Sequence, residues 1–479
     1  MAAVPPFAPL RLVIIGAGPA GLTAAFENAR HGGTSVVLEK DDVVGGIART
    51  VQHRGFRFDI GGHRFFTKVR EVELLWHEVL THDFIRVPRM SRILYRKKFF
   101  SYPLRPFEAF FGLGPVESLR CALSFFRARL FPKKPEDDLE SWVSNRFGKR
   151  LFSIFFKTYT EKVWGVPCTE IQAEWAAQRI RGLSLWKAVW HAIRKDPTIK
   201  TLIDRFDYPR LGPGQMWETF QARVEAAGSE VLLRHPVQRI AWASGRGIVA
   251  IRAGEAARDF SGDAYISSMP IGELVAALDP PPPAEVASAA GRLRYRDFIC
   301  VALVFEGEGF FPDNWVYVHS PELKVGRVQN FNNWSKALVP RDGVTCLGLE
   351  YFCFESDPIW KASDEELIAL GKDEIARTGL VPAGAPLVEG AVVRMAKTYP
   401  MYDPGYGDCV AMVRRFVERE LPNLQLVGRN GMHRYNNQDH AMVTALYAVR
   451  NLYGASHDLW AVNVDEDYHE EARETRSPD

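Results

Sequence analysis

The sequence has few of the features that would place it in a familiar class at once. Its six cysteines are scattered over 479 residues without a C-x-x-C pair, which excludes the usual spacing of a zinc site or a redox dithiol. No segment contains about 18 uninterrupted apolar residues, so no membrane-spanning helix is predicted. Sixty basic residues are nearly cancelled by 58 acidic ones, and the net charge of +2 argues against nucleic acid as a partner.

The composition that remains is typical of a soluble globular protein. Hydrophobic residues make up 47% of the chain and charged residues 25%. The length exceeds one ordinary domain, so two domains or one elaborated domain are expected. The N-terminal segment has no charged region followed by an apolar run and a cleavage site. We therefore expect a cytoplasmic protein without a metal site.

The first 40 residues carry a nucleotide-binding pattern. The segment LVIIGAGPAGLTAAFENAR predicts a buried strand, a glycine turn and a helix over 19–30, and SVVLEK predicts a second strand ending in Glu39. Gly16 permits the tight turn, Gly18 lets a pyrophosphate approach the backbone, and Gly21 lets the helix pack closely on the strand. The phosphate would lie at the helix N-terminus, and the Glu39 carboxylate would accept the ribose hydroxyls.

A second glycine pair follows the acid. Gly45 and Gly46 would let the backbone pass beside a second phosphate, where Arg49 would balance the charge. This order of strand, turn, acid and glycine pair resembles the flavin-binding group that includes amine oxidases, protoporphyrinogen oxidase and UDP-galactopyranose mutase. The resemblance makes FAD the expected cofactor.

Under that resemblance, the segment DIGGHRFF would run against the isoalloxazine ring. Gly61 and Gly62 lack the Cβ atoms that would hold the backbone away, and His63 would hydrogen-bond the flavin edge. A plain loop turn and a structural histidine are the alternatives for these residues. Farther along the chain, Val237 falls where a backbone would bracket the adenine.

The expected fold class is α/β, with two interleaved domains. One is a doubly wound, Rossmann-like FAD-binding domain. The other is an α+β substrate domain that contains a helical insert and an antiparallel sheet. The FAD-binding domain is assigned to residues 1–90, 213–270 and 395–479, and the substrate domain to residues 91–212 and 271–394.

Local patterns predict individual elements within these domains. An amphipathic helix is expected over about 215–227, and DAYISSMP is expected to return as a strand. The alternation in DFICVALVFEG and NWVYVHS predicts half-buried strands. Ser363 and Glu366 form the pattern of a capped helix start.

Cations and aromatic rings recur at the ends of the predicted elements. Guanidinium groups match phosphate oxygens, and rings stack on bases or sugars. Any one such residue is more often an ordinary surface arginine or core aromatic. The set therefore supports a substrate site only through the order of its members in the chain. The set comprises Arg179, Trp315, Tyr317, Arg327, Tyr399, Arg429 and Tyr435.

That order resembles UDP-galactopyranose mutase, especially the eukaryotic type. The similar segments include GGHRFF, FFSYPL, YTEKVWGVPCTEIQAEWAAQRI, DNWVYV, GRVQNFNNWS, TYPMYDPGY and GRNGMHRYNNQDHAM. The resemblance implies that Arg179 and Arg327 bind the substrate pyrophosphate and form the catalytic set with His63. It implies further substrate contacts from Tyr102, Thr160, Trp315, Tyr317, Tyr399 and Tyr435.

The same resemblance assigns the segment around Gly428 to the flavin. Gly428 would end a strand, and Arg429 would lie beside the flavin. The helix that follows would present its first amides, with Asp439, His440 and Met442, to the pyrimidine end of the ring. Thr160 stands where the eukaryotic mutases tend to have asparagine, so the identity of the sugar stays open.

The leading functional hypothesis is an FAD-dependent isomerase that interconverts the pyranose and furanose forms of a nucleotide sugar. Reduced FAD would attack the anomeric carbon through N5 while the two arginines stabilise the departing nucleoside diphosphate. An external reductant, with NADPH as the candidate, would be needed only for activation. The alternative is an FAD-dependent oxidoreductase of amine oxidase, porphyrinogen oxidase or desaturase type that acts on a small organic substrate. The oligomeric state stays open.

A third hypothesis is weak association with a membrane surface. Residues 99–134 mix many phenylalanines with arginine and lysine, a composition that suits a bilayer interface. The competing interpretation places the aromatic rings in a core and the cations in water, and the sequence alone favours it.

Overall fold

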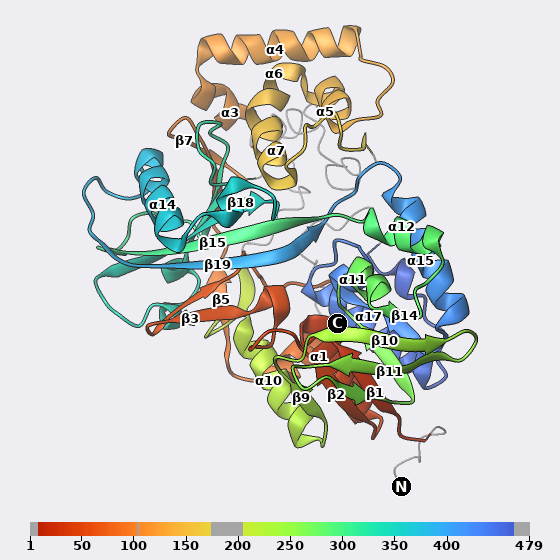
Figure 1. Cartoon of the computed structure of the whole chain (residues 1–479). Coiled ribbons are helices and arrows are strands. Elements are labelled where there is room, and N and C mark those ends of the chain that lie inside the picture. Colours follow the sequence, from red (N-terminus) through yellow and green to blue (C-terminus); the bar gives the residue numbers. More distant parts are fainter. Residues whose placement is uncertain (1–7, 103, 105, 174–204, 464–479) are drawn as a thin grey trace, which may run out of the picture.

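The chain folds around two large sheets of different construction (Figure 1). The computed structural model describes residues 8–102, 104, 106–173 and 205–463. One large sheet is entirely parallel and contains the first strand of the chain. The other has seven strands that are mostly antiparallel. A group of helices lies on the side of it that faces away from the parallel sheet. The expected α/β class with a Rossmann-like part is confirmed.

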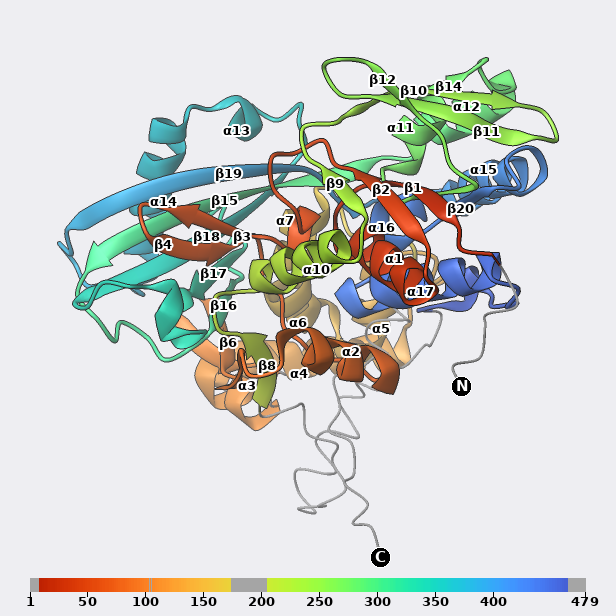
Figure 2. The ribbon, with the colours of Figure 1, turned by 90° about the horizontal axis from the view of Figure 1, so that it is seen from below.

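The parallel sheet has the strand order β20-β13-β1-β2-β9. Its central strand is an apolar run because both of its faces are covered. Figure 2 shows helices α1, α10 and α17 together on one side of it, and α1 packs against the other two. The strands are β1 (Arg11–Ile15), β2 (Thr34–Leu38), β9 (Glu230–Leu232), β13 (Ala264–Ser267) and β20 (Leu424–Leu426), and the helices are α1 (Pro19–Arg30), α10 (Gly214–Ala226), α17 (Gln438–Leu452) and α2 (Arg70–Leu80).

A four-stranded sheet and three helices extend the same core. The sheet order is β12-β11-β10-β14, and helices α11 and α12 pack together, with α15 against α12. These elements are β10 (Val237–Ala243), β11 (Gly247–Ala253), β12 (Arg258–Phe260), β14 (Leu278–Asp279), α11 (Ile271–Ala276), α12 (Ala284–Gly291) and α15 (Tyr406–Glu420). Apolar side chains between Ile271 and Leu293 belong to the core of the parallel sheet. The domain boundaries remain a prediction, and this packing favours a division near residue 294 over one at residue 270.

The seven-stranded sheet has the order β19-β15-β18-β17-β16-β6-β7. Its strands are β6 (Ser91–Tyr95), β7 (Lys98–Ser101), β15 (Tyr295–Glu306), β16 (Trp315–Val318), β17 (Arg327–Asn330), β18 (Val344–Cys353) and β19 (Leu387–Pro400). The predicted strands are present, but β15 is buried along almost its whole length. Helix α14 (Asp364–Thr378) covers one face, while Phe58, Phe331 and Trp334 pack against the other. The predicted capping box at Ser363 and Glu366 is present.

The helical insert lies at the edge of this sheet. Helix α4 is the outermost element and runs along the top of the molecule in Figure 1. The described part of the insert consists of α3 (Pro106–Leu113), α4 (Pro115–Leu130), α5 (Leu139–Phe147), α6 (Lys149–Phe152), a π-helical turn (Ser153–Lys157) and α7 (Thr158–Trp164). No helix within the described residues is long and apolar enough to cross a membrane.

Small elements complete the fold around the two large sheets. They are the pairs β3 (Thr50–His53) with β4 (Phe56–Asp59) and β5 (Phe84–Pro88) with β8 (Arg205–Pro209), and the short helices α13 (Pro358–Lys361) and α16 (Gly428–Gly431). All six cysteines are buried free thiols. Among the described residues, no group of three or more His, Cys, Asp or Glu side chains is placed to hold a metal ion.

Candidate active site

The glycine turn between β1 and α1 has the geometry of a phosphate cradle. Gly16 has φ +96°, a conformation that only glycine adopts without strain, and Gly18 stands at the N-cap of α1. A Cβ atom on Gly21 would lie 1.8 Å from the carbonyl oxygen of Gly16, so the helix packs on the turn more closely than any side chain allows. The first amides of α1 are thus open to an anion.

The side chain of Glu39 holds this turn through hydrogen bonds to backbone amides. Its Oε2 atom accepts a hydrogen bond from the Ala17 amide at 2.7 Å, and Oε1 accepts one from the Asp41 amide at 3.0 Å. Burial raises the pKa of the Glu39 carboxyl. The amide of His235 donates to the Glu39 carbonyl at 2.7 Å, which brings the start of β10, with Val237, near this carboxylate. The expected ribose and adenine contacts of Glu39 and Val237 stay predictions.

The second glycine pair lies directly against the first turn. The Gly45 amide donates to the Ala17 carbonyl at 2.9 Å, and a Cβ on Gly46 would lie 3.5 Å from the Cα of Gly18. Both glycines have positive φ. The side chain of Arg49 pairs with Asp41 at 2.6 Å. Two backbone segments without side chains therefore pack directly against each other at the N-terminus of α1, which fits a diphosphate bound along their surface.

Gly61, Gly62 and His63 form the next part of the site. Gly61 has φ +90°, and a Cβ there would lie 3.8 Å from Nη2 of Arg327. The Nδ1 atom of His63 is buried and makes no hydrogen bond within the described residues. Burial, together with the nearby cations Arg429 and Arg327, lowers the pKa of His63 to about 3. The imidazole is thus neutral and has an unused ring nitrogen, which fits a hydrogen bond to a flavin edge.

The segment from Gly428 to Met442 differs in detail from the prediction. Strand β20 ends at Leu426, and Gly428 begins the helical turn α16 rather than ending a strand. Helix α17 begins at Gln438 with Asn437 as N-cap, where the Asn437 amide donates to Nδ1 of His440 at 3.3 Å.

The predicted flavin contacts on α17 are all buried: Asp439, His440 and Met442. The His440 ring takes part in the cap, and the Met442 sulfur accepts from the Trp76 indole at 3.1 Å. The side-chain amide of Gln438 donates to the Arg64 carbonyl at 3.0 Å. This bond connects α17 to the segment that follows Gly61, Gly62 and His63. Contact with a flavin stays a prediction for these residues. The backbone amides at the start of α17 are candidates for that contact as much as the side chains are.

Arg429 joins this segment to the aromatic wall. Its Nε donates to the Asn436 carbonyl at 2.9 Å and its Nη1 to the Thr398 carbonyl at 3.1 Å. The guanidinium lies 4.6 Å from the ring centre of Tyr435, and Tyr435 stacks on Tyr399 at 5.6 Å. Two predicted substrate tyrosines and a predicted flavin arginine therefore lie side by side.

A second aromatic group surrounds Tyr317 on β16. The ring centre of Tyr317 lies 4.8 Å from that of Tyr102, 5.3 Å from that of Tyr159 and 6.4 Å from that of Trp315. Trp315 is buried, stacks on Trp334, and has the guanidinium of Arg64 over its ring at 4.9 Å. Trp315 is thus mainly a core ring that borders the site.

Arg327 on β17 is held in a buried ion pair. Its Nε donates to Oε2 of Glu350 at 2.7 Å, and Nη2 lies 2.6 Å from the same oxygen. The amide of Gln329 donates to the other carboxylate oxygen at 2.7 Å. Burial opposes the charge of Arg327, but the Glu350 carboxylate more than compensates and raises the arginine pKa well above its usual value. Arg327 is therefore a fixed cation beside Gly61.

The structure brings together most of the predicted site, but not all of it. His63, Arg327, Tyr399, Arg429 and Tyr435 are linked through direct contacts or electrostatic interaction. Thr160 follows Tyr159 on α7 and is half-buried. Arg179 lies outside the described residues.

Sequence reasoning missed several side chains of the site. Glu350 is an acid inside the apolar strand VTCLGLEYFC, and this alone marks it as a residue that needs a cationic partner. Tyr159 precedes the KVW motif, and Lys162 within it donates to three backbone carbonyls, of Val318, Ser320 and Val325. Burial lowers the pKa of Lys162 to about 8. This lysine positions the loop after β16.

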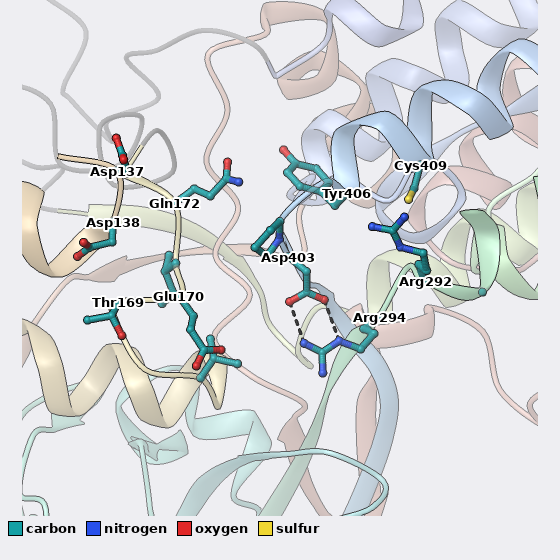
Figure 3. Close-up of a pocket in the computed structure, with 14 residues that line it drawn as sticks. Asp137, Asp138, Thr169, Glu170, Gln172, Arg292, Arg294, Asp403, Tyr406 and Cys409 are labelled. Carbon is teal, nitrogen blue, oxygen red and sulfur yellow. Dashed lines mark hydrogen bonds and ion pairs between the residues drawn. The ribbon is translucent and has the colours of Figure 1, made fainter. Parts of the chain in front are cut away.

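A separate cavity of about 730 Å³ lies between the helical insert and helices α12 and α15 (Figure 3). Arg294 and Asp403 face each other in it through two hydrogen bonds, of 2.8 and 2.9 Å. Glu170, Gln172 and Tyr406 also point into the hollow. None of the predicted site residues lines this cavity. We therefore treat it as separate from the site described above, although it is large.

Comparison with known proteins points to a flavoprotein. Residues 19–437 match the family model described as flavin containing amine oxidoreductase. A solved structure of reduced UDP-galactopyranose mutase is 21% identical and has a TM-score of 0.81, over 95% of this chain and 98% of that one. A putrescine oxidase structure is 16% identical with a TM-score of 0.63, over 93% and 99% of the two chains. At these identities the likeness shows a shared fold.

A curated relative has a redox activity. The 15-cis-phytoene desaturase of Synechococcus elongatus is 24% identical over 296 residues. The match covers 55% of this chain and 59% of the desaturase, so it spans less than two thirds of that protein's length.

Proposed function

Because this chain belongs to the family of flavin-containing amine oxidoreductases, we propose that it is an FAD-dependent isomerase of a sugar carried on a nucleoside diphosphate. The observation that carries the proposal is the buried cation Arg327, whose Nη2 lies 3.8 Å from the position of a Cβ on Gly61. A fixed positive charge beside the glycine loop suits a substrate that releases an anionic diphosphate at the flavin.

The sign of the local charge supports this choice of substrate. Arg327 and Arg429 both lower the pKa of His63 through their positive charge. Glu350 is the carboxylate that faces Arg327. A protonated amine would be repelled by this group of arginines, whereas an anion would be attracted.

The residues around the glycine segments fit FAD. The packed turns at Gly18 and Gly46 would present backbone without side chains to a diphosphate, and Gly61 and Gly62 lack the Cβ atoms that would block a ring. When bound and reduced, FAD would supply an electron-rich ring nitrogen that can attack an anomeric carbon. The N-terminus of α17 would favour a negative ring by roughly 0.3–2 kcal/mol.

The side chains of the site would then act as follows. Arg327 would stabilise the charge that develops on the departing diphosphate, and Glu350 would keep the guanidinium in place. Neutral His63 would accept or donate one hydrogen bond at the flavin edge. Tyr317, Tyr399 and Tyr435 would contact the sugar and the nucleotide with their rings and hydroxyls.

One observation favours an FAD-dependent oxidoreductase as the second candidate. Glu350 compensates the charge of Arg327, so the pair is less positive than a free arginine would be. The surrounding rings of Tyr159, Tyr317 and Tyr399 would accept an apolar or aromatic substrate equally well.

The deciding experiment is an anaerobic incubation of the dithionite-reduced protein with UDP-galactose and related nucleotide sugars. We expect rearranged sugar nucleotide in the reduced sample and none in the same protein kept oxidised, because a non-redox isomerase needs the reduced ring. Chromatography of the products measures it. If the reduced protein neither binds nor rearranges any nucleotide sugar, while the oxidised protein consumes oxygen with an organic substrate, the proposal is wrong.

A pair of variants separates the site from the rest of the surface. Arg179→Ala should weaken nucleotide-sugar affinity by more than tenfold if the resemblance places that side chain at the pyrophosphate. Arg292→Ala, in the separate cavity, is the matched control and should leave affinity unchanged. Equal affinity of both variants and the wild type would remove Arg179 from the proposed clamp.

A further inference from the structure

Helix α4 presents an apolar stripe to the outside of the molecule. Its members recur at the spacing of one helix face, and more than half of each side chain is exposed. Of the fourteen large apolar side chains that are exposed among the described residues, ten lie between residues 99 and 131. The stripe consists of Val116 (65% exposed), Leu119 (59%), Leu123 (61%), Phe126 (60%) and Leu130 (73%).

Aromatic residues lengthen the stripe at both ends. Phe111, before the helix, and Phe131, directly after it, are each 77% exposed. Figure 1 shows α4 along the outer edge of the molecule, with α5 and α6 beneath it. The core interpretation of the aromatic residues in this region, which the sequence alone favoured, is therefore wrong for most of them, while Phe100 is buried.

The opposite face of α4 is firmly held. Ser118 and Cys121 are buried, and the Ser118 hydroxyl donates to the Phe110 carbonyl at 2.5 Å. Arg150 of α6 forms an ion pair with Glu117. The outward stripe is thus no part of what anchors the helix, and fold stability gives no reason for five large apolar residues to lie in water.

Basic side chains flank the stripe. Arg120 and Arg127 follow one edge of it on α4, and Lys133 and Lys134 follow its C-terminal end. All four are exposed. Between residues 96 and 134 the sequence has nine lysines and arginines but only two acids, whereas the whole chain has a net charge of +2. Positive charge is therefore concentrated around the apolar face.

We propose that α4, with Phe111 and Phe131 at its ends, docks on an anionic lipid bilayer. The apolar stripe would enter the acyl boundary while the flanking cations remain among negatively charged headgroups. A second copy of the chain is the less suitable occupant, because a symmetric interface would bring the same cations together. This inference is independent of the reaction at the flavin.

Vesicle sedimentation with the full-length flavoprotein tests the proposal. Vesicles of phosphatidylcholine with 30% phosphatidylglycerol should bind the protein at least tenfold more tightly than pure phosphatidylcholine, and raising the salt from 0.1 to 0.5 M should weaken binding. Leu123→Glu/Phe126→Glu should lose binding by more than tenfold. Arg127→Ala should lose about fivefold, as expected for one cation near the surface.

The matched control carries the same change elsewhere. Leu74 and Val249 are also exposed, at 52% and 42%, so Leu74→Glu/Val249→Glu should bind vesicles like the wild type. Circular dichroism and flavin content should be equal in all variants. Absence of binding to anionic vesicles overturns the proposal. So does a wild-type dimer, seen by size exclusion, that Leu123→Glu/Phe126→Glu converts to a monomer.

Discussion

The cradle for the cofactor and the wall for the substrate are built in opposite ways. The cradle, from Gly16 to Gly46, consists of backbone amides and glycines within one short stretch of chain. The wall collects side chains from β16, β17, β18, β19, α7 and two loops, which lie hundreds of residues apart in sequence. The cradle depends on the absence of side chains, and the wall depends on their presence and charge.

This difference explains where each region is vulnerable. In the cradle a single added Cβ at Gly21 would collide with the carbonyl group of Gly16. In the wall, a substitution removes one partner from a group of rings and charges. The loss of stability then depends on which polar or charged group is left buried without a partner. The predictions below test this contrast in order of expected size.

The largest effect is expected for Gly21→Ala. Its Cβ would lie 1.8 Å from the Gly16 carbonyl oxygen, so the turn must open and α1 must shift. We expect loss of bound FAD and a fall in the free energy of unfolding of about 4 kcal/mol or more. Absorbance of the purified protein near 450 nm and chemical denaturation measure these effects. Gly407→Ala on α15, where a Cβ meets nothing within 4 Å, is the control and should keep the flavin.

The next effect concerns the ion pair of the wall. Arg327→Met leaves the Glu350 carboxylate buried without its cation, and we expect a loss of about 3–5 kcal/mol in the free energy of unfolding. Arg327→Met/Glu350→Met removes both charges and should recover most of that loss while nucleotide-sugar affinity stays low. Chemical denaturation of the single and double variants gives the coupling energy. Additive losses in the double variant would contradict a coupled buried pair.

A third prediction concerns Asp59, at the end of β4 and two residues before Gly61. Asp59 is buried, accepts a hydrogen bond from Thr50 at 2.8 Å and another from Tyr208, and burial raises its pKa from 3.8 to about 7. Between pH 4 and 7 the folded state keeps a proton that the unfolded state releases. Asp59 therefore makes folding less favourable as pH rises, by roughly 1.4 kcal/mol per pH unit.

Asp59→Asn removes this titration. The stability of the wild type relative to the variant should therefore fall from pH 4 to pH 7 and level off above it. Chemical denaturation of both proteins at each pH checks the prediction, because the contributions of other groups cancel in the difference. A difference that stays constant over this range would show that Asp59 keeps an ordinary pKa.

The smallest effect is expected for Tyr317→Phe. The ring contacts with Tyr102 and Tyr159 stay, so the free energy of unfolding should change by less than about 0.5 kcal/mol. If the hydroxyl contacts the substrate, affinity should fall by about 0.5–1.5 kcal/mol, the usual value of one hydrogen bond. Titration of the reduced protein with UDP measures it. Unchanged affinity would restrict Tyr317 to packing.

Particular residues show how far the sequence could be interpreted. The helix over 19–30, the turn at Gly16 and the cap at Ser363 follow from neighbours within a few positions, and the structure confirms them. The burial of β15 was not visible, because alternation describes one strand and not the layers above and below it. The exposure of Phe126 was the less favoured alternative, since helical periodicity does not say which face meets the core.

The sequence by itself determined the glycine cradle, because glycine positions and strand–helix spacing are local constraints on the backbone. Only the tertiary structure decided that Arg327 is paired with Glu350, that His63 is held neutral, and that α4 turns its apolar face outward. Each of these depends on the distance between residues far apart in the chain, and therefore on the electrostatic environment and burial that folding creates.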